Sequence, residues 1–378
     1  MNSNPVIPLF DLNYGPEEEE AVLRVLHKKW LTMGEEIEAF EHEFAEYLGV
    51  KHALAVSSCT TALHLANIAA GVQQGSEVIC PSLTFAATVN AIIYAGGIPV
   101  FADVVSLDDW TISPKEIAKK ITSKTKAVVV MHYGGFACQM AEILKIAHDN
   151  NIKVIEDAAH APGSTYRENK LGSIGDISCF SFFSNKNIST GEGGMICTNN
   201  DDYASLIKIM RSHGMTSSTI DRHRGHSFSY DVTTLGYNYR LDEIHAALGR
   251  AQLKKLDKGN CCRRKLALRY KAGIEKISKI KLPFTDCQEK ANYHIFPVLL
   301  DESIDRNHLM TYLRELGIQT SIHYPSIHNF SFYRQHYKAY DLKLTDYISE
   351  HELTLPMYAN MKNEQIDFIT ENICRYFK

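Results

Sequence analysis

Long apolar runs are missing from this sequence. No stretch of the 378 residues approaches the roughly 18 consecutive apolar residues that span a bilayer, and the first residues, MNSNPVIPLF, lack the basic start and apolar core of a secretion signal. Positive charge is not in excess either, since 40 Lys and Arg stand against 44 Asp and Glu. We therefore expect a cytoplasmic protein without a membrane or nucleic-acid partner.

Cysteine pairs in metal-binding or redox spacing are also missing. The nine cysteines are scattered singly apart from the neighbours Cys261 and Cys262, and none stands in a Cys-x-x-Cys arrangement. We expect reduced thiols and no metal site. Internal repeats and low-complexity tracts are absent as well, and 45% hydrophobic with 22% charged residues is the composition of a fully folded globular protein.

The sequence does contain a regular alternation of strand-like and helical segments. Pro16 and four glutamates open a predicted helix over residues 16–30. From residue 52 onward, β-rich runs alternate with helical stretches: ALAVS, TALHLANIAA, EVIC, ATVNAIIYAG, AVVVM, AEILKIAHD, KVIED and CFSFF. This order is typical of right-handed βαβ crossovers, so the sequence predicts an α/β fold with a mostly parallel, mixed sheet.

The pattern changes near residue 241. A long Lys- and Arg-rich helix over residues 241–275 is followed by a strand at YHIFPVLL, a helix ending at Gly317, a strand at IQTSIHY and a final helix after Asn363. The chain is also longer than a single compact core usually is. We therefore predict a large domain of residues 1–245 and a smaller α+β domain of residues 246–378.

Polar residues follow three of the predicted strands of the large domain. KVIED ends at Asp157, CFSFF is followed by Ser184, Asn185 and Lys186, and ALAVS runs into a Ser/Thr-rich stretch, residues 57–61, before a helix. Ligands of parallel sheets bind at the carboxyl ends of the strands, so we expect these groups to converge at one edge.

These residue types are the ones that pyridoxal 5'-phosphate (PLP) chemistry requires. The cofactor needs a lysine for its aldehyde, a carboxylate that keeps its pyridine nitrogen protonated, and donors for its phosphate. Lys186 and Asp157 are candidates for the first two roles. Small hydroxylated residues at a helix N-terminus suit the phosphate, and Phe85 could stack on the ring.

Each of these residues also has an ordinary interpretation, which the spacing leaves open. Lys186 could be a surface charge and Asp157 a helix cap. The stretch at residues 57–61 could be an N-cap without a ligand, Phe85 a core residue, and the glycines of residues 191–194 a turn.

Several long motifs in order give the chain a resemblance along nearly its whole length to the sugar aminotransferase family often called DegT/StrS. They include WLTMGEEIEAFEHEFAEYLGV, VSSCTTALHLA, SEVICPSLTFAATVNAI, VIEDAAHAPGSTY, GDISCFSFFSNKNISTGEGGMICTNN, LGYNYRLDEIHAALGRAQLKKL, IHYPSIH and LTLPMY. The resemblance implies a fold-type-I PLP-dependent transferase whose large domain binds the cofactor.

The resemblance also implies roles for single residues. Lys186 matches the family's Schiff-base lysine and Asp157 its pyridinium partner. The remaining cofactor contacts that it implies are Cys59, Thr60, Thr61 and Ser181 around the phosphate, Phe85 on the ring face, His160 near the ring, and Asn238, which would reach the partner chain's phosphate in a homodimer with shared sites.

Two positions distinguish this chain within the resemblance. Cys59 stands where many relatives have glycine in the phosphate cup, and we interpret it as a small buried residue. Related dehydratases replace the Schiff-base lysine with histidine, whereas Lys186 is retained here. Transamination is therefore favoured over dehydration.

The function that we expect is amination of a nucleotide-linked ketosugar with glutamate as amino donor. Two alternatives stay open: a PLP enzyme for a non-nucleotide keto compound such as a ketocyclitol, and a catalytically idle binding or regulatory protein on the same fold. An active enzyme is yellow and loses that colour with glutamate, which an idle protein would not do.

Two further groups of residues are candidates for the substrate. A basic segment could bind the pyrophosphate of the sugar nucleotide or could be an ordinary solvated loop; its residues are His213, Arg222, His223, Arg224 and His226. His323 and Tyr324 could face the sugar or could support the domain interface.

Overall fold

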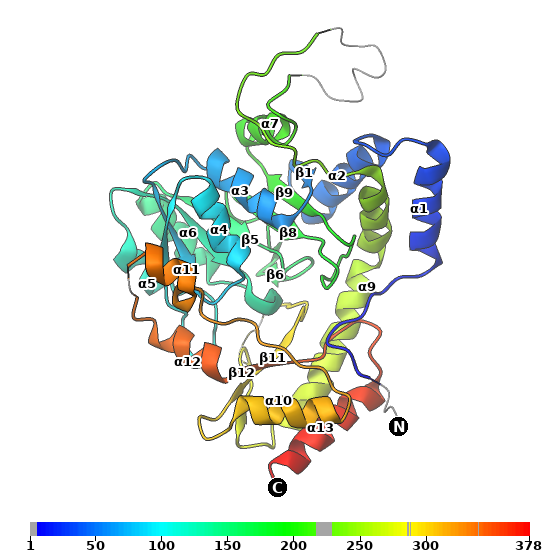
Figure 1. Cartoon of the computed structure of the whole chain (residues 1–378), viewed down its shortest axis with the longest axis vertical. Coiled ribbons are helices and arrows are strands. Elements are labelled where there is room, and N and C mark those ends of the chain that lie inside the picture. Colours follow the sequence, from blue (N-terminus) through cyan, green and yellow to red (C-terminus); the bar gives the residue numbers. More distant parts are fainter. Residues whose placement is uncertain (1–5, 217–228, 286, 288, 339) are drawn as a thin grey trace.

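A seven-stranded sheet forms the centre of the larger part of the molecule (Figure 1). The computed structural model describes residues 6–216, 229–285, 287, 289–338 and 340–378. The strand order is β1-β9-β8-β5-β4-β2-β3, and only β9 runs antiparallel to its neighbours. The strands are β1 (His52–Val56), β2 (Glu77–Pro81), β3 (Ile98–Ala102), β4 (Thr125–Met131), β5 (Lys153–Asp157), β8 (Ile177–Ser181) and β9 (Gly194–Thr198). The predicted α/β fold with a mostly parallel sheet is confirmed.

Helices cover both faces of this sheet, which is why its strands are nearly all apolar. The first face packs against α3 (Cys59–Ala69), α4 (Ala86–Tyr94) and α7 (Asp201–Met210). The other face packs against α5 (Pro114–Lys120), α6 (Met140–Asp149), α2 (Glu35–Leu48) and the first part of α9 (Glu243–Ile274). Successive strand residues alternate between the two cores, as Val78 and Ile79 do in β2.

The helix α9 connects this part to a smaller unit (Figure 1). Leu256 lies in a core of the large part and Leu266 in the core of the small unit. That unit holds a three-stranded sheet and two helices that pack on it: β10 (Ile280–Lys281), β11 (Phe296–Leu300), β12 (Glu352–Leu355), α10 (Arg306–Glu315) and α13 (Asn363–Tyr376). Because α9 contributes to both cores, the domain boundary between residues 245 and 246 stays a prediction.

The remaining elements are short or peripheral. They are α1 (Pro16–Lys28), the hairpin β6 (Thr165–Tyr166) and β7 (Asn169–Lys170), the 3₁₀ turns η1 (Tyr133–Gly135) and η2 (Ile327–Asn329), α11 (Ser331–His336) and α12 (Lys343–His351). None of the helices in the described ranges is both long enough and apolar enough to cross a membrane.

The strand predicted at IQTSIHY is wrong. Its residues form only isolated bridges, Ile318 with Ile7 and Ser321 with Thr354. The strand that pairs with β11 on this side is β12, which the sequence did not predict. In this segment Ile318 packs into the core of the small unit, and His323 and Tyr324 line a cavity at the carboxyl edge of the large sheet.

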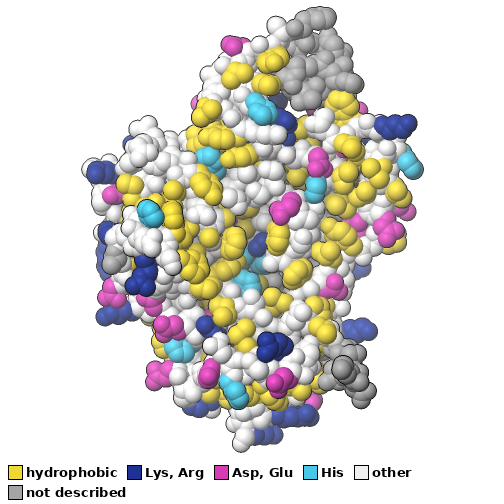
Figure 2. All heavy atoms as spheres, viewed as in Figure 1, with side chains coloured by type: hydrophobic (Ala, Val, Ile, Leu, Met, Phe, Trp, Pro, Cys, Tyr) yellow, Lys and Arg dark blue, Asp and Glu magenta, His cyan; other side chains and the backbone are white. Residues whose placement is uncertain are grey.

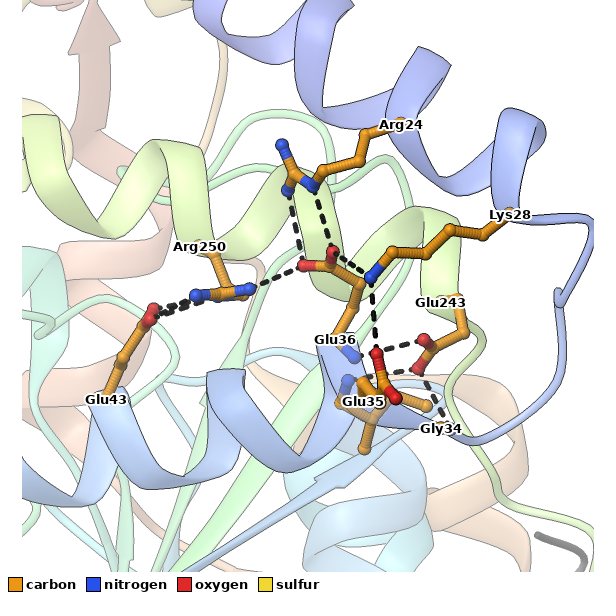
Figure 3. A network of polar contacts seen from close by, with 9 residues as sticks. Arg24, Lys28, Gly34, Glu35, Glu36, Glu43, Glu243 and Arg250 are labelled. Atoms are coloured by element: carbon orange, nitrogen blue, oxygen red, sulfur yellow. Dashed lines mark hydrogen bonds and ion pairs between the residues drawn. The ribbon is translucent and has the colours of Figure 1, made fainter. Parts of the chain in front are cut away.

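A polar network fixes α1 and α2 to α9 (Figure 3). The buried carboxylate of Glu36 in α2 binds Arg24 of α1 at 3.0 Å and Arg250 of α9 at 2.6 Å. The carboxylate of Glu243, at the start of α9, accepts hydrogen bonds from the backbone N–H groups of Gly34, Glu36 and Ile37. These three N–H groups belong to the N-cap residue and the first turn of α2. That helix has no side-chain cap hydrogen bond of its own, so Glu243 caps α2 from another helix.

Candidate active site

A cavity of about 360 Å³ opens at the carboxyl ends of β1, β4, β5 and β8. Seven of the predicted site residues line it: Cys59, Thr60, Phe85, Asp157, His160, Ser181 and Lys186. They are brought together from four separate segments, which follow β1, β2, β5 and β8, because these parallel strands end at the same edge. The predicted convergence at that edge is therefore observed, although the role of each residue stays a prediction.

Asp157 is the last residue of β5 and its carboxylate is held by two donors. The hydroxyl of Thr88 in α4 donates to one carboxylate oxygen at 2.7 Å, and the backbone N–H of Ala159 donates to the other at 3.2 Å. Burial raises the pKa of Asp157, and the two hydrogen bonds oppose that rise. A cationic group in the cavity would complete the pairing of this buried carboxylate.

The N-terminus of α3 presents unpaired donors to the same cavity. The Ser58 hydroxyl caps the helix by accepting from the N–H of Thr61, and the Ser58 carbonyl accepts from the N–H of Ala62. Among the described residues, the backbone N–H groups of Cys59 and Thr60 have no partner. Two free N–H groups at a helix N-terminus form a binding site for an anion such as a phosphate.

Glycine at position 194 brings β9 against this helix start. A Cβ at Gly194 would lie 2.6 Å from the carbonyl carbon of Ser58, so a side chain there would push α3 away from the cavity. Cys59 is buried, and that burial raises the pKa of its thiol well above the ordinary value. This agrees with the interpretation of Cys59 as a small neutral residue.

Lys186 follows β8 in a turn closed by its own backbone N–H, which donates to the Phe183 carbonyl at 2.8 Å. Burial lowers the pKa of Lys186 to about 8, although Cys59 and Asp157 act in the opposite direction. A lysine with this pKa is partly a neutral amine near neutral pH and can attack an aldehyde. Its Nζ lies 3.4 Å from Nε2 of His294.

Ser181 and Phe85 complete the predicted cofactor surroundings. The Oγ of Ser181 accepts from the N–H of Phe183 at 3.3 Å, which leaves the hydroxyl proton free for a ligand in the cavity. Phe85, directly before α4, is 60% exposed even though it lines the cavity. Phe85 is therefore not a core residue, and the core interpretation is wrong.

His160 connects the cavity to the small unit. Its Nδ1 accepts from the backbone N–H of Gly134 at 3.2 Å, so the proton of the neutral ring is on Nε2. Nε2 lies 2.9 Å from the Tyr324 hydroxyl and donates to it, which leaves the Tyr324 proton for another acceptor. Burial lowers the pKa of His160 well below its usual value, so the ring is neutral.

Two predicted site residues do not line the cavity. Thr61 turns its hydroxyl back to the Ser58 carbonyl at 2.8 Å, so it serves the cap of α3. Asn238 forms a backbone bridge with Ser212. Its predicted contact lies in a partner chain and stays a prediction.

Most of the basic segment lies outside the described residues. Arg222, His223, Arg224 and His226 all fall within residues 217–228. Of this segment, His213 is described, and its backbone N–H donates to the Tyr237 carbonyl at 2.8 Å.

Three residues in the cavity or in contact with its residues were not predicted. Thr88 contacts Asp157, which is 69 residues away in the sequence, and His294 contacts Lys186, which is 108 residues away. Contacts between positions this far apart cannot be recognised from local spacing. For Asn185 the sequence predicted no role beyond its place next to Lys186. Its side-chain oxygen is buried without a partner among the described residues, which marks it as an acceptor available to a bound ligand.

This donor set fits PLP. The free N–H groups of Cys59 and Thr60 and the Ser181 hydroxyl suit a phosphate, Asp157 suits a protonated ring nitrogen, and Lys186 suits an aldehyde. The cavity volume is also within the usual range of small-molecule sites. In the described part of the chain, no group of three or more His, Cys, Asp or Glu side chains is arranged to hold a metal ion.

Known proteins resemble this chain along nearly its whole length. A model of the DegT/DnrJ/EryC1/StrS aminotransferase family matches residues 13–374. The spore coat polysaccharide biosynthesis protein SpsC of Bacillus subtilis is 37% identical over 366 residues, which make up 95% of this chain and 94% of SpsC.

Solved structures of related proteins share the fold. PseC of Helicobacter pylori, an aminotransferase involved in the biosynthesis of pseudoaminic acid, aligns with a TM-score of 0.92 and 30% identity over 98% of this chain and 99% of its own. Spr1654 of Streptococcus pneumoniae in its PLP form aligns with a TM-score of 0.89 and 25% identity over 97% of both chains. Spr1654 has also been solved in a PMP form.

These matches confirm the family, the fold type, the enzyme class and the cofactor that the sequence predicted. The chain therefore belongs to the DegT/DnrJ/EryC1/StrS aminotransferase family and is a PLP-dependent aminotransferase.

Proposed function

We propose that this aminotransferase converts a nucleotide-linked ketosugar to an aminosugar, with glutamate as the amino donor. The observation that carries the proposal is the convergence of Lys186, Asp157 and the free N-terminus of α3 in one cavity. The comparisons support the sugar: SpsC is named for polysaccharide biosynthesis and PseC for the biosynthesis of pseudoaminic acid.

Each residue of the cavity has a defined task in this proposal. When bound, PLP supplies an aldehyde that exchanges amino groups and a ring that withdraws electrons from the reacting carbon. Asp157 holds a proton at the ring nitrogen, and the N–H groups of Cys59 and Thr60 with the Ser181 hydroxyl hold the phosphate. Phe85, which lines the cavity, would pack against the ring.

Lys186 moves the proton in both halves of the reaction. Its Nζ takes the proton from the α-carbon of the amino donor in the first half, and it delivers a proton to the sugar carbon that receives the amino group in the second half. A pKa of about 8 suits both directions, because the amine and the ammonium are both populated near neutral pH.

We include a homodimer with shared sites in the proposal. Several large hydrophobic side chains that precede Asn238 in the sequence or line the cavity are exposed to solvent in the single chain: Tyr230 56%, Val232 53%, Leu235 77%, Phe85 60% and Phe183 45%. Hydrophobic side chains also gather across the middle of the face in Figure 2. Exposed hydrophobic side chains that lie together are typical of a protein interface. In the proposed dimer a second copy would cover them and bring Asn238 to the phosphate bound by its neighbour.

A substrate panel tests the proposed function. The purified holoenzyme is incubated with glutamate and with 3-keto and 4-keto sugars, each as the nucleotide conjugate and as the free sugar, together with a ketocyclitol. We expect an aminosugar nucleotide from at least one conjugate and none from the matching free sugar. Efficient amination of the ketocyclitol, or of free sugars as well as their conjugates, would contradict the nucleotide-linked substrate.

A further inference from the structure

A chain of four hydrogen bonds runs from a backbone carbonyl to the amine of Lys186. The Asn260 amide nitrogen lies 2.9 Å from the Pro162 carbonyl, and the Asn187 amide nitrogen lies 2.9 Å from the Asn260 amide oxygen. Nδ1 of His294 lies 3.1 Å from the Asn187 amide oxygen, and Nε2 of His294 lies 3.4 Å from Nζ of Lys186.

The Pro162 carbonyl fixes which group donates and which accepts in each of these hydrogen bonds. A backbone carbonyl can only accept, so Asn260 must turn its NH₂ group to Pro162 and its oxygen to Asn187. Asn187 must then donate to Asn260 and turn its own oxygen to His294. That oxygen also only accepts, so the ring proton of His294 is on Nδ1 and Nε2 carries a lone pair.

Burial favours this pattern of hydrogen bonds over other partners and protonation states of Asn260 and His294. Asn260 is 1% and His294 4% exposed, so little of either side chain is open to bulk solvent. The backbone of His294 is fixed as well, since its N–H donates to the Gly134 carbonyl at 3.0 Å. Burial also lowers the pKa of His294 well below its usual value, with further lowering from His160 and Lys186, so the ring does not take a second proton.

We propose that His294 is a catalytic residue that holds the Lys186 amine by accepting a hydrogen bond at Nε2, and that Asn187 and Asn260 are positioning residues that fix the ring in that tautomer. The inference rests on the proposed function of Lys186. A free amine has two N–H groups and one lone pair, so a fixed acceptor for one N–H aims the lone pair elsewhere. Lys186 would then keep its orientation as a base after its release from the cofactor.

The protein without cofactor allows a test that does not depend on turnover. The modification rate of Lys186 by a dilute amine-reactive reagent is followed against pH by peptide mass spectrometry. In the wild type we expect a midpoint near pH 8. His294→Phe removes the acceptor, which stabilises the ammonium more than the amine, so its midpoint should fall by about one pH unit.

Two variants separate hydrogen bonding from packing. His294→Gln offers an amide oxygen near the position of Nε2. We expect its midpoint within about 0.3 pH units of the wild type, because the Lys186 ammonium can still donate a charge-assisted hydrogen bond to that oxygen. Asn187→Leu releases the tautomer and should shift the midpoint in the same direction as His294→Phe. His328→Gln changes a buried histidine that hydrogen-bonds to Ser82 instead of Lys186, and it serves as the control.

The tautomer is observed directly by ¹⁵N NMR of histidine-labelled protein, with the His294 signals identified by their loss in His294→Gln. We expect a protonated Nδ1 and an unprotonated Nε2. A protonated Nε2, or an unchanged Lys186 midpoint in His294→Phe, would overturn the inference. If His294→Phe does not fold, the midpoint of Asn187→Leu and the tautomer decide.

The holoenzyme adds a kinetic measurement. With glutamate alone, we expect the loss of the cofactor's absorbance to be roughly 10- to 100-fold slower in His294→Phe than in the wild type, with recovery in His294→Gln. If borohydride does not attach the cofactor to Lys186, the proposed function is contradicted. The role of His294 is then still decided by the titration and the NMR experiment, which are done without cofactor.

Discussion

At the scale of single residues, the charge on Asp157 is the feature with the clearest chemical consequence. Asp157→Asn preserves a side chain that can hydrogen-bond with Thr88 but removes the negative charge that keeps a ring nitrogen protonated. We predict that turnover falls by about 100-fold or more, because a nearby opposite charge shifts a pKa by roughly 1–3 units and each unit corresponds to about tenfold in rate. Most of the PLP should be retained. Turnover at saturating PLP and the bound PLP released by alkali measure the two effects. Unchanged turnover would mean that Asp157 is only a helix cap.

Glu352 is a buried residue whose titration should be visible in stability. Its carboxyl group accepts from the His323 N–H at 2.8 Å and from the Thr354 hydroxyl, and burial raises its pKa from 4.5 to about 8. The folded state therefore holds a proton that the unfolded state loses, and the stability from this proton is present below pH 4.5 and lost as the pH rises through 8.

Glu352→Gln removes this titration. We predict that the free energy of unfolding of the wild type falls relative to that of Glu352→Gln by up to about 5 kcal/mol between pH 4.5 and pH 8.5. Urea denaturation of both proteins at several pH values in this range measures the difference. A difference that stays constant with pH would contradict the raised pKa.

The residues that could be predicted are those placed by local signals. Lys186, Asp157 and Ser181 stand at or just after strands, and the start of α3 follows β1 directly, so the order of elements was enough to bring them to one edge. His294 had no such signal. It approaches Lys186 only because the small unit packs beside the large sheet, and that packing depends on side chains spread along the whole chain.

At the scale of elements, the start of α2 depends on Glu243. Its carboxylate accepts from the N–H groups of Gly34, Glu36 and Ile37 at 2.9 to 3.0 Å (Figure 3). We predict that Glu243→Ala lowers the free energy of unfolding by about 2–4 kcal/mol, because three N–H groups lose a charged acceptor. Urea denaturation measures the loss, and Glu20→Ala, which changes an exposed glutamate of α1, is the matched control. Equal losses in both variants would refute the cap.

Elements with strong periodicity could be predicted, and their neighbours in space could not. The helices at residues 16–30 and after Asn363 were expected and are present as α1 and α13. The strand β12 was missed, because ELTL is short and its pairing with β11 joins residues more than 50 positions apart. IQTSIHY has more β-branched residues, yet its backbone pairs only at single bridges.

At the scale of the whole molecule, shared sites predict complementation between two inactive variants. Lys186→Ala and Asn238→Asp, the second of which sets a negative charge against a phosphate, are unfolded together and reassembled at equal ratio. Half of the dimers would be mixed, and each would hold one site with both intact residues. We predict recovery of about a quarter of wild-type activity if the sites are independent. Activity no higher than the two variants alone, with chain exchange shown by mass spectrometry, would rule out the shared site.

The most direct measurement concerns the lysine on which the whole account depends. The protein is saturated with PLP, reduced with borohydride, digested, and searched by mass spectrometry for the phosphopyridoxyl group. We predict the label on Lys186 and its loss in a folded Lys186→Ala variant, together with a loss of turnover. A label on another lysine, or a Lys186→Ala variant with near-normal activity in the absence of added amine, would contradict the central claim.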